Sequence, residues 1–402
     1  SDGVLVVSTD QGRLYAYSAL DTLQVTHWPI EPNVSLYPTD DWGEFYRDTA
    51  ALLLKQSDQR AGYCLVLGCD RGQLAYELAR QSELTVLVVE PDPEKAENAR
   101  VLLEAAGLHG MRVQVVQANF DDIPFSNYFA NLITSESFLL DAKVPGTGER
   151  IARHLKPCGG VAMLVTADRP DGRAAEPDQV AVGEWFAQLR WEQPGDYVQR
   201  DRWKLFRRGK LPGAGEWSHQ YGNVANTSYT VDKRIKEGLG VLWYGDPGPS
   251  AMINRHEAAA APLSTNGRMF IQGTDKVMCY DAYNGTFLWE HYNPGAIRTG
   301  VFNNRETSNL AASEDALYVA VNDKCVALDA RTGEVRHEFV VPTSEDGVPR
   351  AWAYLAYDDN LVFGTSTVRE ELERRLRRRG LTVKSQTDAV FAVDAKSGDR
   401  LW

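Results

Sequence analysis

The chain of 402 residues exceeds the size of one ordinary hydrophobic core, so two or more domains are expected. It is 43% hydrophobic and 24% charged, which is typical of globular proteins and excludes a disordered chain. Its net charge of −12 would repel a phosphate backbone, and no apolar run approaches the roughly 20 residues that span a bilayer. We therefore expect neither a nucleic-acid partner nor a membrane span.

Residues 1–22 contain two strands of alternating apolar residues joined by a short polar turn, in the stretch DGVLVVSTDQGRLYAYSAL. The first residues lack the basic and apolar regions of a signal peptide, and the last, 400–402, directly follow a strand motif. We therefore expect the sequence to be cut at both ends, with further repeats outside it. The sequence therefore predicts no cellular compartment.

Residues 38–208 alternate between strands and helices, which is typical of a doubly wound, Rossmann-like α/β sheet. This change of periodicity marks a second kind of domain. Helices are predicted at 43–55, 73–81 and 93–106, and strands at 63–67, 84–89, 112–117, 130–134 and 160–166.

The ends of the first two strands of this segment carry the features of a nucleotide site. A turn from Gly68 to Gly72 follows the first strand, and glycine lets the backbone approach a ligand closely beside the free N–H groups of the next helix. Glu90 closes the second strand, where a carboxylate can accept hydrogen bonds from ribose hydroxyls. Cys64 and Cys69 flank the first strand end and are expected to be buried thiols. The five cysteines have no zinc-ligand spacing, so no metal site is expected.

The ordered set of strand, GxxxG turn, helix, strand and Glu, followed by QANFDDIPF, NLITSE and RHLKPCGG, resembles the class I S-adenosylmethionine (SAM) methyltransferases over residues 40–208. The resemblance implies that SAM is the cofactor, that 131–136 border the transferred methyl group, and that WEQPGDYVQRDRWKLFRR forms the closing antiparallel hairpin that nicotinamide dehydrogenases lack. The residues expected to bind the cofactor are Gly68, Cys69, Asp70, Gly72, Glu90, Pro91, Asn119, Phe120 and Ser135.

Several positions depart from that family. Asp70 stands where the family usually has the middle glycine, and Asn119 and Asn131 stand where it commonly has acids. No residue is assigned a catalytic role. Glu136 is the one charged candidate where the acceptor would lie, and a helix cap or a solvated carboxylate is an equal alternative. His154 is expected on the surface.

Residues 214–402 repeat the pattern of the first segment, beginning near 266, 314 and 358, with the last copy resuming at 388. In each, the second strand ends near an Asp that is expected to bond the Gly turn that follows, and the third carries a bulky residue such as Trp289. Asp281 and Asp329 are 48 residues apart, the length of a four-stranded blade.

This DAxxGxxxW-like element resembles the quinoprotein-like, PQQ-type β-propellers, over 1–22 and 214–402. Three or four blades are visible, fewer than a closed ring needs, so the all-β part is predicted to be a partial propeller. An insertion at 368–387 has leucines at helical spacing and five arginines, which indicates a solvated helix or, alternatively, a contact to an anionic partner.

Together these features predict a multidomain SAM-dependent methyltransferase for an unidentified small-molecule or protein acceptor. Its methyltransferase domain is expected to be inserted into the propeller, which would serve substrate or partner recognition. The alternative is a non-catalytic binding or scaffold protein with a degenerate SAM fold. A quinone-cofactor dehydrogenase is the third hypothesis. It is disfavoured, and PQQ is not expected, because the chain lacks the adjacent cysteine pair on which that family stacks its quinone.

Overall fold

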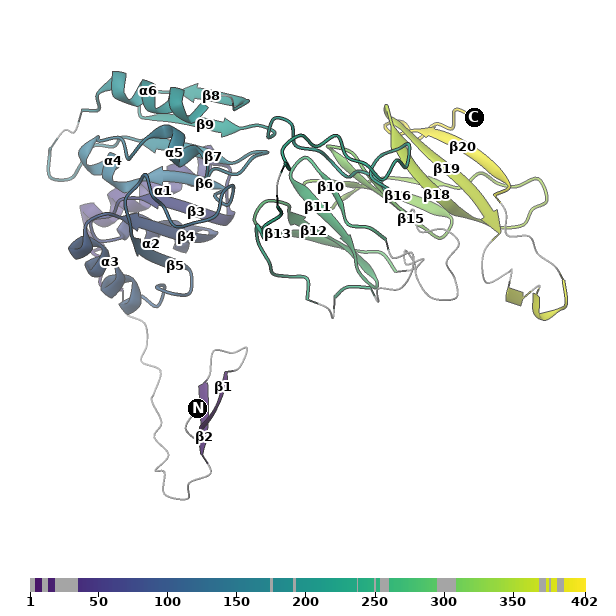
Figure 1. The fold of residues 1–402 in the computed structure, drawn as a ribbon, viewed down its shortest axis with the longest axis horizontal. Coiled ribbons are helices and arrows are strands. Elements are labelled where there is room, and N and C mark those ends of the chain that lie inside the picture. The colour runs from purple at the N-terminus through teal and green to yellow at the C-terminus, as the bar shows by residue number, and fades with distance from the viewer. Residues whose placement is uncertain are drawn as a thin grey trace.

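The computed structural model describes residues 4–8, 14–18, 35–173, 176–190, 193–236, 238–248, 251–253, 260–294, 309–368, 374–375, 377–381 and 387–402. The elements form three groups, namely an N-terminal β-hairpin, an α/β domain and a row of antiparallel sheets (Figure 1).

The α/β domain is built on a seven-stranded sheet in the order β5-β4-β3-β6-β7-β9-β8. The first five strands in that order are parallel, whereas β9 is antiparallel to both β7 and β8. The strand order reverses beside β3, and a parallel sheet opens a ligand crevice at such a switch point, outside the carboxyl ends of its strands. The strands are β3 (Ala61–Leu67), β4 (Glu83–Glu90), β5 (Val113–Gln117), β6 (Leu132–Ser135), β7 (Val161–Val165), β8 (Gly195–Gln199) and β9 (Trp203–Arg208).

Helices cover both faces of this sheet, which is why its central strands are continuous apolar runs. Along β3, Val66 packs into a core with α1, α2 and α3, while Leu65 packs into a second core with α4, α5 and α6. The helices are α1 (Asp41–Ser57), α2 (Gln73–Gln81), α3 (Pro93–Ala105), α4 (Glu136–Asp141), α5 (Gly148–Ala152) and α6 (Gln179–Arg190). The predicted doubly wound sheet is confirmed, and β8 and β9 form the hairpin that the resemblance implied.

Three antiparallel sheets follow in the chain. The first contains β10 (Leu263–Thr265), β11 (Arg268–Gln272), β12 (Lys276–Asp281) and β13 (Phe287–Tyr292). The second contains β14 (Leu310–Ala312), β15 (Ala316–Val321), β16 (Lys324–Asp329) and β17 (Val335–Val340), and the third β18 (Arg350–Asp358), β19 (Leu361–Val368) and β20 (Ala389–Asp394). These sheets confirm the predicted propeller blades, and within the described ranges they form an open row, not a ring (Figure 1).

The aspartates predicted to end the second strands in fact end the third strands, because β10, β14 and β18 each add a strand before the predicted repeat, and these aspartates make the predicted turn contacts. Asp281 accepts a hydrogen bond from the Tyr283 amide at 2.9 Å, and Asp329 from the Arg331 amide at 2.8 Å. Asp394 makes the same contact in the third sheet. Each Asp therefore fixes the tight turn that leads into the next strand.

Tryptophan side chains dock on the glycines of these turns. The Trp289 indole donates to the Ala330 carbonyl at 3.1 Å, and a Cβ on Gly333 would lie 2.6 Å from its ring. Trp243 donates in the same way to the Ala282 carbonyl at 3.0 Å, 2.4 Å from where a Cβ on Gly285 would lie. The two contacts are therefore copies of one another.

The amino ends of the α/β strands contact the first of these sheets. Lys156, before β7, pairs with Asp281 at 2.8 Å between Nζ and Oδ2. The Asn284 amide donates to the Phe129 carbonyl at 2.8 Å and to Asn131 Oδ1 at 2.7 Å. The repeats thus hold the α/β domain by the edge opposite the carboxyl ends of its strands.

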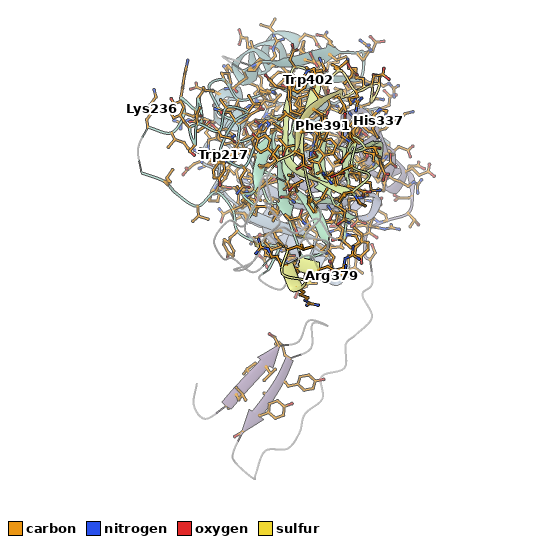
Figure 2. All side chains as sticks on the ribbon, turned by 90° about the vertical axis from the view of Figure 1, so that its right-hand side faces the viewer. Trp217, Lys236, His337, Arg379, Phe391 and Trp402 are labelled. Atoms are coloured by element: carbon orange, nitrogen blue, oxygen red, sulfur yellow. The ribbon has the colours of Figure 1, made fainter. Side chains whose placement is uncertain are left out.

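The hairpin of β1 (Val4–Ser8) and β2 (Leu14–Ser18) lies apart from the other elements in both views (Figures 1 and 2). Both of its faces are exposed; Val6 is 61% and Tyr17 56% accessible. Within the predicted insertion at 368–387, residues 374–375 and 377–378 are helical and Arg379, labelled in Figure 2, is exposed. The rest of the predicted helix, 369–373, 376 and 382–386, lies outside the described residues.

Candidate functional site at the carboxyl edge of the sheet

The turn between β3 and α2 is packed so closely that its two glycines cannot be replaced without displacement. Gly68 and Gly72 have φ values of +79° and +74°, in the left-handed region that favours glycine. A Cβ on Gly68 would lie 2.7 Å from Cβ of Ser137, and one on Gly72 3.1 Å from Leu103. The turn therefore lies against α4 on one side and α3 on the other.

Glu90 lies beneath this turn at the end of β4 and is 6% exposed. Its Oε2 accepts the Cys69 amide at 2.6 Å, and its Oε1 accepts the Asp92 amide at 2.9 Å. Each carboxylate oxygen has a further lone pair, so the side chain keeps capacity for a ligand hydroxyl. Glu90 thus holds the glycine turn and borders the crevice at once.

Glu136 lies on the other side of the turn and is fully buried. Its Oε1 accepts the Asp70 amide at 3.4 Å, and the Tyr46 hydroxyl bonds to the same carboxyl group. Burial raises the pKa of Glu136 to about 7. Of the two alternatives from the sequence, the solvated carboxylate was wrong, because Glu136 is fully buried. The N-cap of α4 is Ser135, which accepts the Phe138 amide at 3.0 Å, whereas Glu136 caps another helix by bonding the Leu74 amide in the first turn of α2.

A cavity of about 450 Å³ opens beside the turn, and it carries charges of both signs. Arg169 pairs with Asp171 at 2.6 Å, whereas Arg71 and Lys95 pair with no carboxylate in the parts of the chain that the structure describes. Such a lining suits a zwitterionic ligand. The lining residues are Pro38, Asp40, Trp42, Tyr46, Asp70, Arg71, Gln73, Lys95, Leu140, Asp141 and Arg169.

Sequence reasoning missed the contribution of α1 to this cavity. Trp42 and Tyr46 are four residues apart, so they lie on one helix face. Asp40 begins that helix by accepting the Trp42 amide at 3.0 Å. A second tyrosine, Tyr37, donates from its hydroxyl to the Arg71 carbonyl at 2.8 Å and so fixes the turn. The spacing of Trp42 and Tyr46 across the start of the helix predicted at 43–55 was the signal that could have found these residues.

The other predicted cofactor residues follow the carboxyl ends of neighbouring strands. Pro91 is half-buried beside Glu90, and Asn119 is exposed after β5. Phe120 is half-buried, and a Cβ on Gly146 would lie 2.8 Å from its Cβ. The structure therefore brings all nine predicted residues to one edge of the sheet. They are Gly68, Cys69, Asp70, Gly72, Glu90, Pro91, Asn119, Phe120 and Ser135.

Two interpretations from the sequence need correction. Asn131 does not border this edge, because it precedes β6 and its Oδ1 accepts the Tyr63 amide at 3.1 Å at the amino edge, beside Asn284. His154 is not on the surface. It is 1% exposed with Nδ1 3.0 Å from the Ser126 carbonyl oxygen, and burial lowers its pKa to about 4.

Two family models match the chain. The model described as "Methyltransferase domain" matches residues 64–159, which include the glycine turn and Glu90. The model described as "Outer membrane protein assembly factor BamB" matches residues 240–402, the three sheets. The chain joins a methyltransferase domain to PQQ-type propeller repeats. No curated protein matches it.

Solved structures similar to the methyltransferase domain include a protein of Methanococcus maripaludis described as a SAM-dependent methyltransferase, with 19% identity over 42% of this chain and 86% of that one (TM-score 0.32). A SAM-dependent methyltransferase from Aquifex aeolicus is 16% identical over 42% of this chain and 93% of that one (TM-score 0.32). A quinohemoprotein alcohol dehydrogenase of Pseudomonas putida HK5 is also similar to this chain, with 20% identity over 47% of this chain and 26% of that one (TM-score 0.33).

Among the described residues, no group of three or more His, Cys, Asp or Glu side chains is placed to hold a metal ion. Cys64 and Cys69 are buried free thiols, as predicted. None of the described helices has the length and apolarity to span a bilayer.

Proposed function

We propose that the methyltransferase domain, residues 38–208, binds SAM at the carboxyl edge of its sheet and methylates an acceptor that enters the cavity beside α1. The contact between Glu90 and the Cys69 amide, at 2.6 Å, carries this proposal. It joins the glycine turn to the acid at the switch point of the sheet, where ribose hydroxyls are bound in such folds.

The residues of this edge fit the chemical parts of SAM. Glu90 is the proposed ribose acceptor, and Asn119 and Phe120 border the proposed adenine site. The cavity charges suit the methionine end, since Arg71 or Lys95 can pair with its carboxylate and Asp70 or Asp141 with its ammonium group. We therefore propose Asp70, which departs from the family, as the partner of the ammonium group.

Bound SAM would supply a sulfonium methyl group, which an acceptor lone pair takes in line as the C–S bond electrons return to sulfur. This chain would then contribute mainly proximity and orientation. Glu136 is fully buried beneath the turn, so we assign it to positioning the Asp70 amide and not to proton transfer.

The propeller is proposed to anchor the methyltransferase domain and bind a partner. All the residues that line the cavity lie between 38 and 169, so none comes from the repeats. The repeats contact the amino edge instead, through Lys156 and Asn131. This arrangement leaves the carboxyl edge open to an acceptor.

Calorimetric titration with SAM and with S-adenosylhomocysteine tests the proposal. Gly68→Ala should abolish binding, because the added Cβ displaces the turn or Ser137. Gly110→Ala is the matched control, since Gly110 has φ +77° with no atom within 4 Å of its Cβ position. Micromolar binding by the wild type and the control alone would support the cofactor site. No binding at millimolar ligand would favour the scaffold alternative.

A further inference from the structure

The N-terminal hairpin has the strand register of a propeller blade. In β1 and β2, Val4 lies opposite Ser18 and Val7 opposite Tyr15. In β11 and β12, Arg268 lies opposite Asp281, and the pairs continue in step to Gln272 opposite Val277. All five pairs correspond, and the sequences LYAYSAL and VMCYDAY align without a gap. The hairpin is therefore equivalent to β11 and β12, the second and third strands of the first complete blade, which is the sheet of β10–β13.

The fourth strand of that blade, β13, also has an equivalent, which begins at Val241, 223 positions after the end of the hairpin at Ser18. Trp243 docks on Gly285 and bonds the Ala282 carbonyl as Trp289 docks on the next blade. Its neighbours match, with Leu242 before it as Leu288 precedes Trp289. Yet residues 241–245 form no strand, and Tyr244 is 93% exposed. This segment thus occupies a fourth-strand position with an open edge.

We propose that β2 docks along residues 241–245, so that the hairpin and this segment form one blade into which the methyltransferase domain is inserted between the third and fourth strands. In the first complete blade, Met278 of β12 lies opposite Glu290 of β13. Met278 aligns with Tyr15 and Glu290 with Tyr244, so the proposed blade places Tyr15 opposite Tyr244. Docking would cover the apolar face of the hairpin that carries Leu14, which is 74% exposed, and Val6, which is 61% exposed.

The chain can make this contact within one molecule. Between Ser18 and Asp41 there are 22 residues, which extend to roughly 75 Å at about 3.3 Å each. A tethered hairpin has an effective concentration far above that of a second copy. The docked blade would hold the methyltransferase domain at both of its ends.

Disulfide trapping tests the register. Residues directly opposite in an antiparallel pair have Cα atoms about 4.5–5.5 Å apart, which a disulfide can bridge. The double variant Tyr15→Cys/Tyr244→Cys should form an intramolecular disulfide on mild oxidation, mapped by mass spectrometry of the unreduced peptides. The matched control Leu14→Cys/Tyr244→Cys should form at least tenfold less, because Leu14 points to the other face. The five native cysteines are free and four are buried.

Equal trapping in both variants, no trapping, or a disulfide between two copies would overturn the proposal. Hydrogen exchange on the unmodified chain gives a second measurement. The amides of 241–245 should exchange at least 100-fold more slowly than free-chain amides, and exchange at the free-chain rate would likewise overturn it.

Discussion

Lys156 and Asp281 form an ion pair between the methyltransferase domain and the first complete blade, with Nζ 2.8 Å from Oδ2. The two side chains are only 8% and 4% exposed, so both charges have been removed from water. Taking charges out of water is costly, so removing one partner of this pair would leave the other charge buried and uncompensated, which strongly destabilises a protein.

Lys156→Met should therefore destabilise the joint between the two parts by about 3–5 kcal/mol, because it leaves the Asp281 carboxylate buried without a cation. Thermal unfolding should change from one transition to two. The control is Arg331→Met, which removes the exposed pair to Asp58 at 3.0 Å and should cost under about 1 kcal/mol. Equal effects of the two substitutions would contradict a special role for the buried pair.

The tryptophan docking contacts predict a contrast among glycines. Gly285→Ala and Gly333→Ala should each cost about 2–4 kcal/mol, because the new methyl group would lie 2.4 and 2.6 Å from an indole ring. Gly347→Ala is the control, with φ +67° and no atom within 4 Å, and should cost about 1 kcal/mol from backbone strain alone. Urea unfolding measures all three, and a loss at Gly347 as large as at Gly285 would refute ring contact as the cause.

The structure accounts for Asn131, one of the departures from the methyltransferase family. Its Oδ1 accepts both the Tyr63 amide and the Asn284 side chain at the joint with the repeats. Asn131→Ala should leave SAM affinity within about twofold of the wild type, while weakening the joint by about 1–3 kcal/mol. Asn119→Ala, at the opposite edge, should weaken SAM binding and leave the stability of the joint unchanged. Calorimetry with SAM and thermal unfolding separate the two, and a tenfold loss of SAM affinity in Asn131→Ala would contradict the assignment.

The sequence predicted most of what depends on local pattern. The alternation of strands and helices placed α2 at 73–81 as observed, and it placed the Gly68 turn and Glu90 at neighbouring strand ends, because both depend on short-range periodicity and turn chemistry. The aspartates of the repeats were likewise predicted to bond their own turns, and they do.

What the sequence could not predict depends on which distant segments meet. The burial of His154 and of Glu136 arises from packing against the loop at 126 and the turn at 70, over 28 and 66 residues. The contact of Asn131 with Asn284 joins two domains across 153 residues. No periodicity encodes such pairs, so a family motif alone misplaced Asn131.

Glu136 makes the stability of the methyltransferase domain dependent on pH. Burial raises its folded-state pKa from 4.5 to about 7, so the folded state binds a proton more tightly than the unfolded state does. Between pH 4.5 and 7 the folded state therefore carries more protons, and this contribution to stability falls as pH rises through that window. The full change is on the order of 3 kcal/mol.

The measurement is urea unfolding of the wild type and of Glu136→Gln from pH 5 to pH 8. The variant cannot ionise there, so the wild type should lose stability relative to it as pH rises, with most of the change complete by pH 8. The folded-state pKa of His154 is lowered to about 4, so its contribution to folding stability changes in the opposite direction and is lost as pH falls below 6.5. It is present in both proteins and cancels in their difference. A difference that stays constant with pH would show that Glu136 is ionised in the folded state throughout this range, and would refute its raised pKa.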